Sequence, residues 1–296
     1  YGLTLKVRDE QNLPHVAITG WIRNSRIEHN YRGYYSYGAR DITFIDNIVA
    51  FNHDYGVDPH DDSSGFIGRR NTVAFNRGTG IAISRRCGDS VIADNHVIGN
   101  GANGILIHDL SNNTLVHDNV VASNRLDGIV IHDSHAISVQ GNVIRNNRNG
   151  LRLFAGSTLI AVQENNFRDN RNASLILLAG WLDQADDLDD YSDGTSWNGQ
   201  NISRHSDGRV RGVIIENNIF ASRATLIFDN AAFVNARGNR FLANVTFTAQ
   251  DTTDLSLDGT GAVGTVSYRL RRSRHEPASY SIAPPPGSLL SVMSGD

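Results

Sequence analysis

The chain has 296 residues, 40% of them hydrophobic and 20% charged, so a sizeable packed core is expected and wholesale disorder is disfavoured. No apolar run approaches the ~20 residues needed to span a membrane, so no membrane span is expected. The formal net charge of −4 argues against nucleic-acid binding through bulk positive charge. The single cysteine, Cys87, excludes an intrachain disulfide framework and a cysteine zinc site. Nearly all positive charge is arginine, which binds carboxylates in a bidentate fork.

A repeat of 22–24 residues dominates the chain. Two columns of asparagine mark it, the second five residues after the first. The first column is Asn47, Asn71, Asn95, Asn119, Asn142 and Asn165, and the second is Asn52, Asn76, Asn100, Asn124, Asn147 and Asn170. After an interruption, we expect the first column to resume at Asn217 and Asn239.

Each unit also contains a glycine followed by a short apolar segment, as in Gly80-Ile81-Ala82-Ile83. Such segments are too short for helices and alternate with period two, so they predict strands. One coil cannot bury its inward face alone, but stacked coils share a core, and stacked asparagines can bond from coil to coil. The sequence therefore predicts an all-β fold, a right-handed parallel β-helix. A leucine-rich repeat has a similar period, but its leucine phrases are missing.

Two segments depart from the repeat. Residues 181–212 are rich in aspartate and are either a loop leaving the wall or a distorted coil. This acidic segment could bind a cation, although a solvated loop is the simpler interpretation. After Asn244 the repeat fades. We therefore expect residues 1–245 to form the β-helix and residues 246–296 to form a C-terminal cap and tail.

Alternation within each glycine phrase indicates which side chains face outward. Ile105 and Ile107 should face the core, and His108 should face out. Aligning the coils by their glycines places Tyr35 beneath Asp58. The same alignment predicts one outward column of Tyr37, His60, Ser84, His108 and His132. Since neighbouring coils lie about 4.7–4.9 Å apart, Tyr37, His60 and Arg85 should lie within ~10 Å of one another along the axis.

One coil breaks the apolar rule. It reads Gly56-Val57-Asp58-Pro59-His60-Asp61 where its neighbours read Gly-Ile-x-Ile. Pro59 takes an inward apolar position and offers no N–H to the ladder. A local violation of a strong repeat is where function is expected, and a simple bulge in the wall is the alternative.

The run from Tyr55 to Asp61 resembles the signature of mannuronan C-5 epimerases of the AlgG type. Gly33-Tyr34-Tyr35-Ser36-Tyr37 resembles the tyrosine-rich coil of that family, and Gly80-Ile81-Ala82-Ile83-Ser84-Arg85 resembles its arginine coil. The resemblance covers roughly residues 1–180. It departs from the family at Asp62-Ser63-Ser64-Gly65-Phe66, where an arginine is usual.

This resemblance implies a polyuronate substrate of the alginate type, a periplasmic or secreted location and partnership with an alginate export complex. It implies no cofactor and no metal. Epimerisation at C-5 needs a base, a proton donor on the opposite face, and a cation or donors that neutralise the carboxylate. By resemblance His60 is the base, with Asp58 or Asp61 fixing its tautomer.

Arg85 is the favoured neutraliser, and Arg86 could replace it if the strand ends early. Water, Tyr35 or Tyr37 returns the proton, although the tyrosines could instead stack on sugar rings. The catalytic set is then His60, Arg85, Asp58, Asp61 and Tyr37. Further substrate contacts are expected from Tyr35, Pro59, Arg86, Ser84, His108, His132 and Arg32.

Other functions fit the same wall less well. A β-helix polysaccharide lyase shares the first chemical step but expels the 4-O substituent. A glycoside hydrolase needs two carboxylates about 5–9.5 Å apart, for which Asp58 and Asp61 would serve without any role for His60. A non-enzymatic adhesin or tailspike would not predict tyrosine, histidine and arginine converging on one wall.

Overall fold

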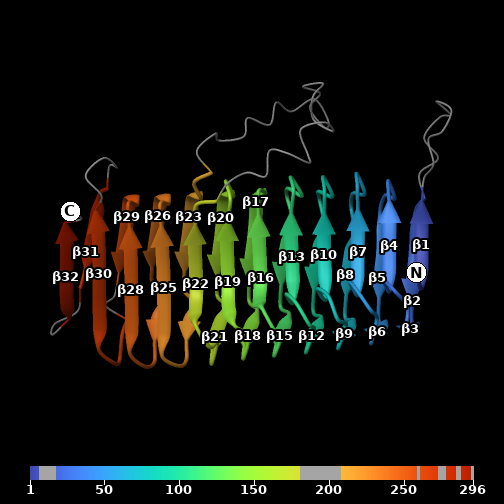
Figure 1. The fold of residues 1–296 in the computed structure, drawn as a ribbon, viewed down its shortest axis with the longest axis horizontal. Coiled ribbons are helices and arrows are strands. Elements are labelled where there is room, and N and C mark those ends of the chain that lie inside the picture. The colour runs from blue at the N-terminus through green and yellow to red at the C-terminus, as the bar shows by residue number, and fades with distance from the viewer. Residues whose placement is uncertain (7–17, 181–207, 259–260, 273–277, 285–287, 295–296) are drawn as a thin grey trace, which may run out of the picture.

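The computed structural model describes residues 1–6, 18–180, 208–258, 261–272, 278–284 and 288–294. These residues form three parallel sheets of 12, 11 and 9 strands, to which successive coils contribute (Figure 1). The prediction of an all-β parallel β-helix is therefore confirmed. Within the described ranges there is no helix long and apolar enough to cross a membrane.

We number the sheets in the order in which the chain enters them. Sheet 1 comprises β1 (Leu3–Lys6), β4 (Tyr34–Tyr37), β7 (Val57–His60), β10 (Ile81–Ser84), β13 (Ile105–His108), β16 (Asp127–His132), β19 (Asn149–Phe154), β22 (Ala173–Leu178), β25 (Ala224–Asp229), β28 (Val245–Gln250), β30 (Val266–Arg272) and β32 (Leu289–Ser294). Sheet 2 comprises β2 (Gly20–Arg23), β5 (Ile42–Ile45), β8 (Ile67–Arg69), β11 (Val91–Ala93), β14 (Leu115–His117), β17 (His135–Gln140), β20 (Thr158–Gln163), β23 (Arg211–Glu216), β26 (Ala232–Arg237), β29 (Thr253–Asp258) and β31 (Tyr280–Ala283). Sheet 3 comprises β3 (Arg26–Glu28), β6 (Ile48–Ala50), β9 (Thr72–Ala74), β12 (His96–Ile98), β15 (Val120–Ala122), β18 (Val143–Arg145), β21 (Asn166–Arg168), β24 (Ile219–Phe220) and β27 (Arg240–Phe241).

The asparagine columns form two buried ladders, as predicted. In the first, Asn95 Nδ2 donates to Asn119 Oδ1 at 3.0 Å and to the Gly68 carbonyl at 2.8 Å. The expectation that this ladder resumes at Asn217 is wrong, because Asn165 Nδ2 donates instead to Asn218 Oδ1 at 3.0 Å. Asn217 is the residue of positive φ that precedes the ladder residue, as Asp46 precedes Asn47 in an earlier coil.

Packing explains why glycine recurs at the entry to sheet 1. A Cβ added to Gly80 would lie 2.6 Å from Val97 Cγ1 and 2.7 Å from the Gly104 carbonyl oxygen. Real Cβ atoms do not approach backbone so closely, so any larger residue would push neighbouring coils apart. The glycine spacing in the sequence therefore marks the corner at which the coils approach most closely.

The wall is continuous across the acidic interruption, because β20 pairs directly with β23 and β22 with β25. Residues 181–207, with most of the acidic cluster, lie outside the described residues. The sheets also continue past residue 245, where β28, β30 and β32 follow β25 in sheet 1. The expected cap and tail at residues 246–296 stay a prediction. The buried rings of Phe247 and Tyr268 stack at 5.1 Å and extend the core. The asparagine repeat in the sequence therefore ends earlier along the chain than the alternation of inward-facing apolar residues.

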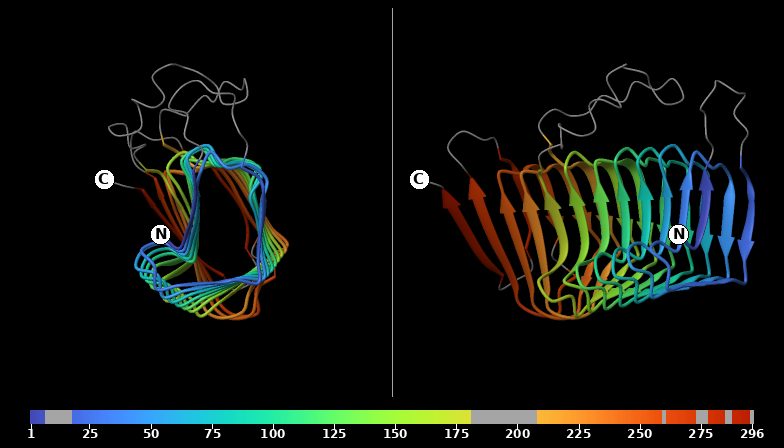
Figure 2. Two further views of the ribbon diagram at one scale, coloured as in Figure 1. Left: turned by 90° about the vertical axis from the view of Figure 1, so that its right-hand side faces the viewer. Right: turned by 45° about the vertical axis from the view of Figure 1, so that its right-hand side comes forward.

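The turns that lead from sheet 3 into sheet 1 project outward beside sheet 1 in the N-terminal coils. Figure 2, viewed along the axis on its left, shows these turns beyond the trace of sheet 1. They place Arg32 and Tyr55 over the outer face of sheet 1, where Arg32 reaches Asp58. This face carries the candidate site.

Candidate active site

Strand β7 has the register that the sequence predicts. Tyr35 of β4 pairs with Asp58, and Tyr37 pairs with His60. Between β7 and the next strand, β10, a single residue pair is in ladder register, Val57 with Ile81. The next donor on β7 would be Pro59, which has no N–H and is buried at the inward position. The coil that carries the motif is therefore bonded less completely to the following coil.

His60 is oriented by Asp61. Asp61 follows the end of β7 with φ 39°, and its Oδ2 lies 2.5 Å from His60 Nδ1. When Nδ1–H is donated to this carboxylate, Nε2 keeps its lone pair and is the nitrogen that can act as a base. The two side chains are 17% and 14% exposed, so both reach the surface. Of the two predicted orienting residues, Asp61 takes the role.

Two arginines approach the same carboxylate from the next coil. Strand β10 ends at Ser84, and both Arg85 and Arg86 have positive φ, so strand alternation no longer separates them. Arg85 Nη1 and Arg86 Nη2 lie 3.9 and 4.0 Å from Asp61 Oδ1. Arg86 also donates to both oxygens of Asp62, at 2.6 and 3.0 Å. Arg85 is the more exposed, at 38% against 18%, and so is better placed to meet a ligand.

These neighbours set the charge of Asp61. Partial burial by itself would raise the pKa of this carboxyl group. The hydrogen bond from His60, the charge of that ring and the charges of Arg85 and Arg86 outweigh burial and hold its pKa below the ordinary value. Asp61 therefore remains an anion that accepts from His60.

Asp58 has a structural role. It is fully buried, where Oδ1 accepts from Ser84 Oγ and Oδ2 from Arg32 Nη1, both at 2.9 Å. Burial raises the pKa of Asp58 even though His60, Arg32 and Ser84 favour its anion. The Arg32 guanidinium also bonds Asp54 at 2.8 Å and lies over the Tyr35 ring. This ion pair fastens the projecting turn to sheet 1.

Two tyrosines of β4 lie beside His60. The Tyr35 ring is 5.5 Å from the His60 ring and is 9% exposed. Burial, followed by the charges of Asp61 and Asp58, raises the pKa of Tyr35 to about 12, so its hydroxyl stays protonated at neutral pH. Tyr37 is 43% exposed and suits contact with a ligand.

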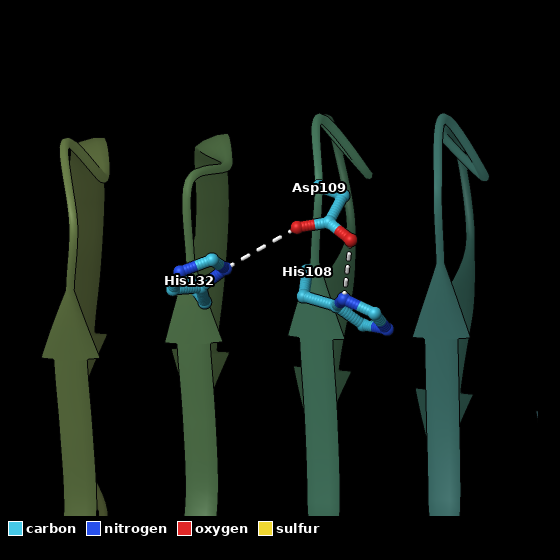
Figure 3. Close-up of side chains that lie close together, drawn as sticks. All are labelled: His108, Asp109 and His132. Carbon is cyan, nitrogen blue, oxygen red and sulfur yellow. Dashed lines mark ion pairs between the residues drawn. The ribbon is translucent and has the colours of Figure 1, made fainter. Parts of the chain in front are cut away.

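A second polar cluster follows His60 along the same face. Figure 3 shows Asp109 between His108 and His132, with Nδ1 of each ring turned toward a different carboxylate oxygen. These distances are 2.7 Å for His108 and 3.3 Å for His132. Together the three side chains are a donor set that could hold a metal ion. Asp109 directly follows His108 in the sequence, as Asp61 follows His60, and that was the signal for a residue we did not select.

The structure brings together His60, Asp61, Arg85, Arg86, Tyr35 and Tyr37. Ser84 and Pro59, two of the expected substrate contacts, have buried side chains, which argues against direct contact with a substrate. Inward-facing Pro59 belongs to the core side of β7, and Ser84 lies between Asp58 and His108. For Arg32, His108 and His132, contact with substrate stays a prediction.

Comparison with known proteins agrees with this architecture. The family model described as a right-handed β-helix region matches residues 15–172. A 55-residue segment, 19% of the chain, is 42% identical to the mannuronan C5-epimerase of Pseudomonas syringae pv. tomato and spans 10% of that enzyme.

The fold is shared with solved structures of alginate epimerases, among them the following two. Periplasmic alginate epimerase AlgG is similar with a TM-score of 0.59 and 23% identity over 87% of this chain and 51% of AlgG. The A-module of Azotobacter vinelandii mannuronan C-5 epimerase AlgE6 has a TM-score of 0.54 and 18% identity over 93% of this chain and 65% of the module. The chain thus spans about half the length of AlgG.

Proposed function

The chain belongs to the right-handed β-helix family, and we propose that it is a C-5 epimerase that converts mannuronate to guluronate residues in an alginate-type polyuronate. The observation that carries the proposal is the arrangement around Asp61. One carboxylate orients His60 as a base, and two arginines lie within 4.0 Å of that carboxylate. Base and cation are the pair that proton abstraction beside a carboxylate requires. The partial match to a mannuronan C5-epimerase supports the same substrate class.

In the proposed reaction His60 Nε2 takes the C-5 proton of a bound uronate. The electron pair of the C–H bond passes into the sugar carboxylate, where Arg85, supported by Arg86, neutralises the extra charge. A water molecule then protonates C-5 from the opposite face, and the imidazolium returns its proton to solvent. The C-5–H bond is broken and re-formed with inverted configuration, so the glycosidic bonds and the chain length are unchanged.

Water is our choice of donor because His60, Tyr35 and Tyr37 all extend from the outer face of sheet 1. A sugar lying on this face presents one side to all three groups. We also propose a periplasmic or secreted location, since the AlgG relative is described as periplasmic.

The direct test is proton NMR of polymannuronate incubated with the full chain. New guluronate signals at constant chain length are expected. A lyase would instead produce an unsaturated chain end and a rise in ultraviolet absorbance. Absence of both signals on polymannuronate would contradict the proposal.

A matched pair of substitutions tests the arginine roles. Arg85→Lys keeps the charge but loses the planar fork, so we expect kcat to fall by roughly 10²-fold or more. Arg86→Lys should have a smaller effect, because Arg86 is already engaged by Asp62. The reverse order of effects, measured by the same NMR assay, would assign the neutralising role to Arg86.

A further inference from the structure

We propose that His108, Asp109 and His132 form a binding site for one divalent transition-metal ion of the zinc class. Two imidazoles and one carboxylate are a donor set typical of such ions. The three ligand atoms lie within 4.8 Å of one another. The inference does not depend on the proposed epimerase activity.

The fold places these groups together through register. His108 and His132 are the last residues of β13 and β16 and are paired in the parallel ladder. Asp109 follows β13 with φ 54°, which turns its carboxylate back over the two rings (Figure 3). The three side chains are 14–23% exposed, so an ion could enter and retain an open coordination position.

The hydrogen bonds of His108 call for a cation between its ring and Asp109. Ser84 Oγ donates to the Asp58 carboxylate, so it accepts from His108 Nε2, which lies 2.8 Å away. Nε2 therefore carries a hydrogen. His108 Nδ1 then faces an anionic oxygen of Asp109 at 2.7 Å. If the ring is neutral in this tautomer, the lone pair of Nδ1 points at the anionic carboxylate of Asp109 and is repelled by it. A cation held between Nδ1 and the carboxylate removes this repulsion.

That cation is either a proton or a metal ion, and the surroundings favour a metal site. Metal-binding histidines commonly donate their second N–H to an oxygen that fixes the ring, as His108 does to Ser84. The His132 ring is held by stacking on Phe154, with centroids 5.2 Å apart. Donors around a tetrahedral zinc with bonds of ~2.0–2.1 Å lie about 3.3 Å apart. The His132 contact has that separation at 3.3 Å, and the His108 contact would need to lengthen from 2.7 Å.

A bound ion would place fixed positive charge on the face that carries His60. Strands β7, β10 and β13 are consecutive in sheet 1. The site is thus about 10 Å from His60, two interstrand spacings away along the axis. The ligand class for the open position is a carboxylate or another hard anion.

The test is calorimetric titration of the chelator-treated full chain with ZnCl₂ alone. We expect one site with a Kd below ~10 µM, weakened at least 100-fold by His132→Gln and by Asp109→Asn. Ser84→Ala should weaken it by about 10–100-fold, the effect of losing a partner that orients a ligand. Thermal unfolding of each variant verifies that it is folded. Because two ligands are substituted independently, the test still stands if one of the two variants fails to fold.

His117→Gln is the matched control. His117 Nδ1 lies 2.8 Å from Asp118 Oδ2 on sheet 2, a similar pair without a second histidine, so this variant should bind zinc like the parent. Parental affinity in both His132→Gln and Asp109→Asn, or no zinc binding below 1 mM, would overturn the proposal. Because no polymer is present, failure of this test leaves the epimerase assay unaffected.

Discussion

Asp61 is the residue on which the charges of the candidate site converge. It orients His60, lies near two arginines, and follows directly after the strand that carries the base. Asp58 was an equal candidate in the sequence, but its carboxylate is buried between Arg32 and Ser84. The two aspartates of one short motif therefore have different tasks, one at the surface and one within the wall.

Substitution of His60 tests the proposed base. His60→Asn should lower kcat by about 10²–10⁴-fold, the usual contribution of a general acid–base group. The fold should survive, because the side chain lies outside the core. The measurement is exchange of C-5 hydrogen with heavy water, followed by NMR. Parental exchange by a folded His60→Asn variant would transfer the role of base to one of the tyrosines.

Asp61 should also make stability depend on pH. Its folded pKa lies below the unfolded value of about 3.9, so the unfolded state binds more protons as pH falls through 4. The stabilisation is thus fully present above about pH 5 and is lost as pH falls toward the folded pKa.

Asp61→Asn should therefore be less stable than the parent by ~1–3 kcal/mol at pH 7, with a gap that narrows below pH 4. Urea unfolding at pH 7, 5 and 3.5 measures the gap. A constant difference across this range would show that Asp61 stabilises by packing alone.

At the scale of elements, the asparagine ladders connect coils whose turns would otherwise leave backbone groups unpaired. Asn95 accepts from the backbone N–H and the side-chain amide of Asn71 and donates to Gly68 and Asn119. Each buried group left without a partner costs about 1–3 kcal/mol. Ladder residues should therefore be far more sensitive to substitution than asparagines outside them.

The pair Asn95→Ala and Asn113→Ala measures this difference. Asn95→Ala should lower the free energy of unfolding by roughly 3 kcal/mol or more, because several buried partners lose their bonds. Asn113 is exposed and makes one side-chain bond to Asp89 at 3.3 Å, so Asn113→Ala should cost about 1 kcal/mol, chiefly because alanine tolerates its positive φ of 55° less well than asparagine. Denaturant titration of both variants provides the comparison, and similar losses would argue against the ladder as the main connection.

At the scale of the whole molecule, the described chain is one continuous solenoid from β1 to β32. Each coil buries its inward face against its neighbours, so an end made by truncation exposes apolar surface. The buried Phe247 and Tyr268 belong to this continuous core.

Truncation after residue 245 should therefore leave an aggregating protein. Most of β28 and all of β29 to β32 would be removed, and the newly exposed coil would lack the partner that covers its apolar side chains. Size-exclusion chromatography is the measurement, with the full chain as the control. A soluble, monomeric product that unfolds cooperatively would instead show that residues 246–296 are not needed to cover the core.

Much of the architecture follows from residues a few positions apart. The spacing of Asn47, Asn71 and Asn95 determines the coil length, and the alternation around Ile105 and Ile107 determines which side chains enter the core. Because parallel coils stack in register, that spacing also places Tyr37 beneath His60. Such features were predictable because a repeated local pattern has one way to stack.

The chemistry around His60 depended on contacts that no repeat specifies. Asp61 rather than Asp58 orients the base because the turn carrying Arg32 projects over sheet 1 and draws Asp58 into the wall. Arg85 and Arg86 both reach toward Asp61 because β10 ends at Ser84. Both arginines therefore lie in a turn with positive φ, where the alternation of a strand no longer sends them to opposite faces. The sequence alone determined the coils and the column of outward residues. Only the tertiary structure decided which outward residues meet, because side-chain directions in the turns depend on how neighbouring coils pack against them.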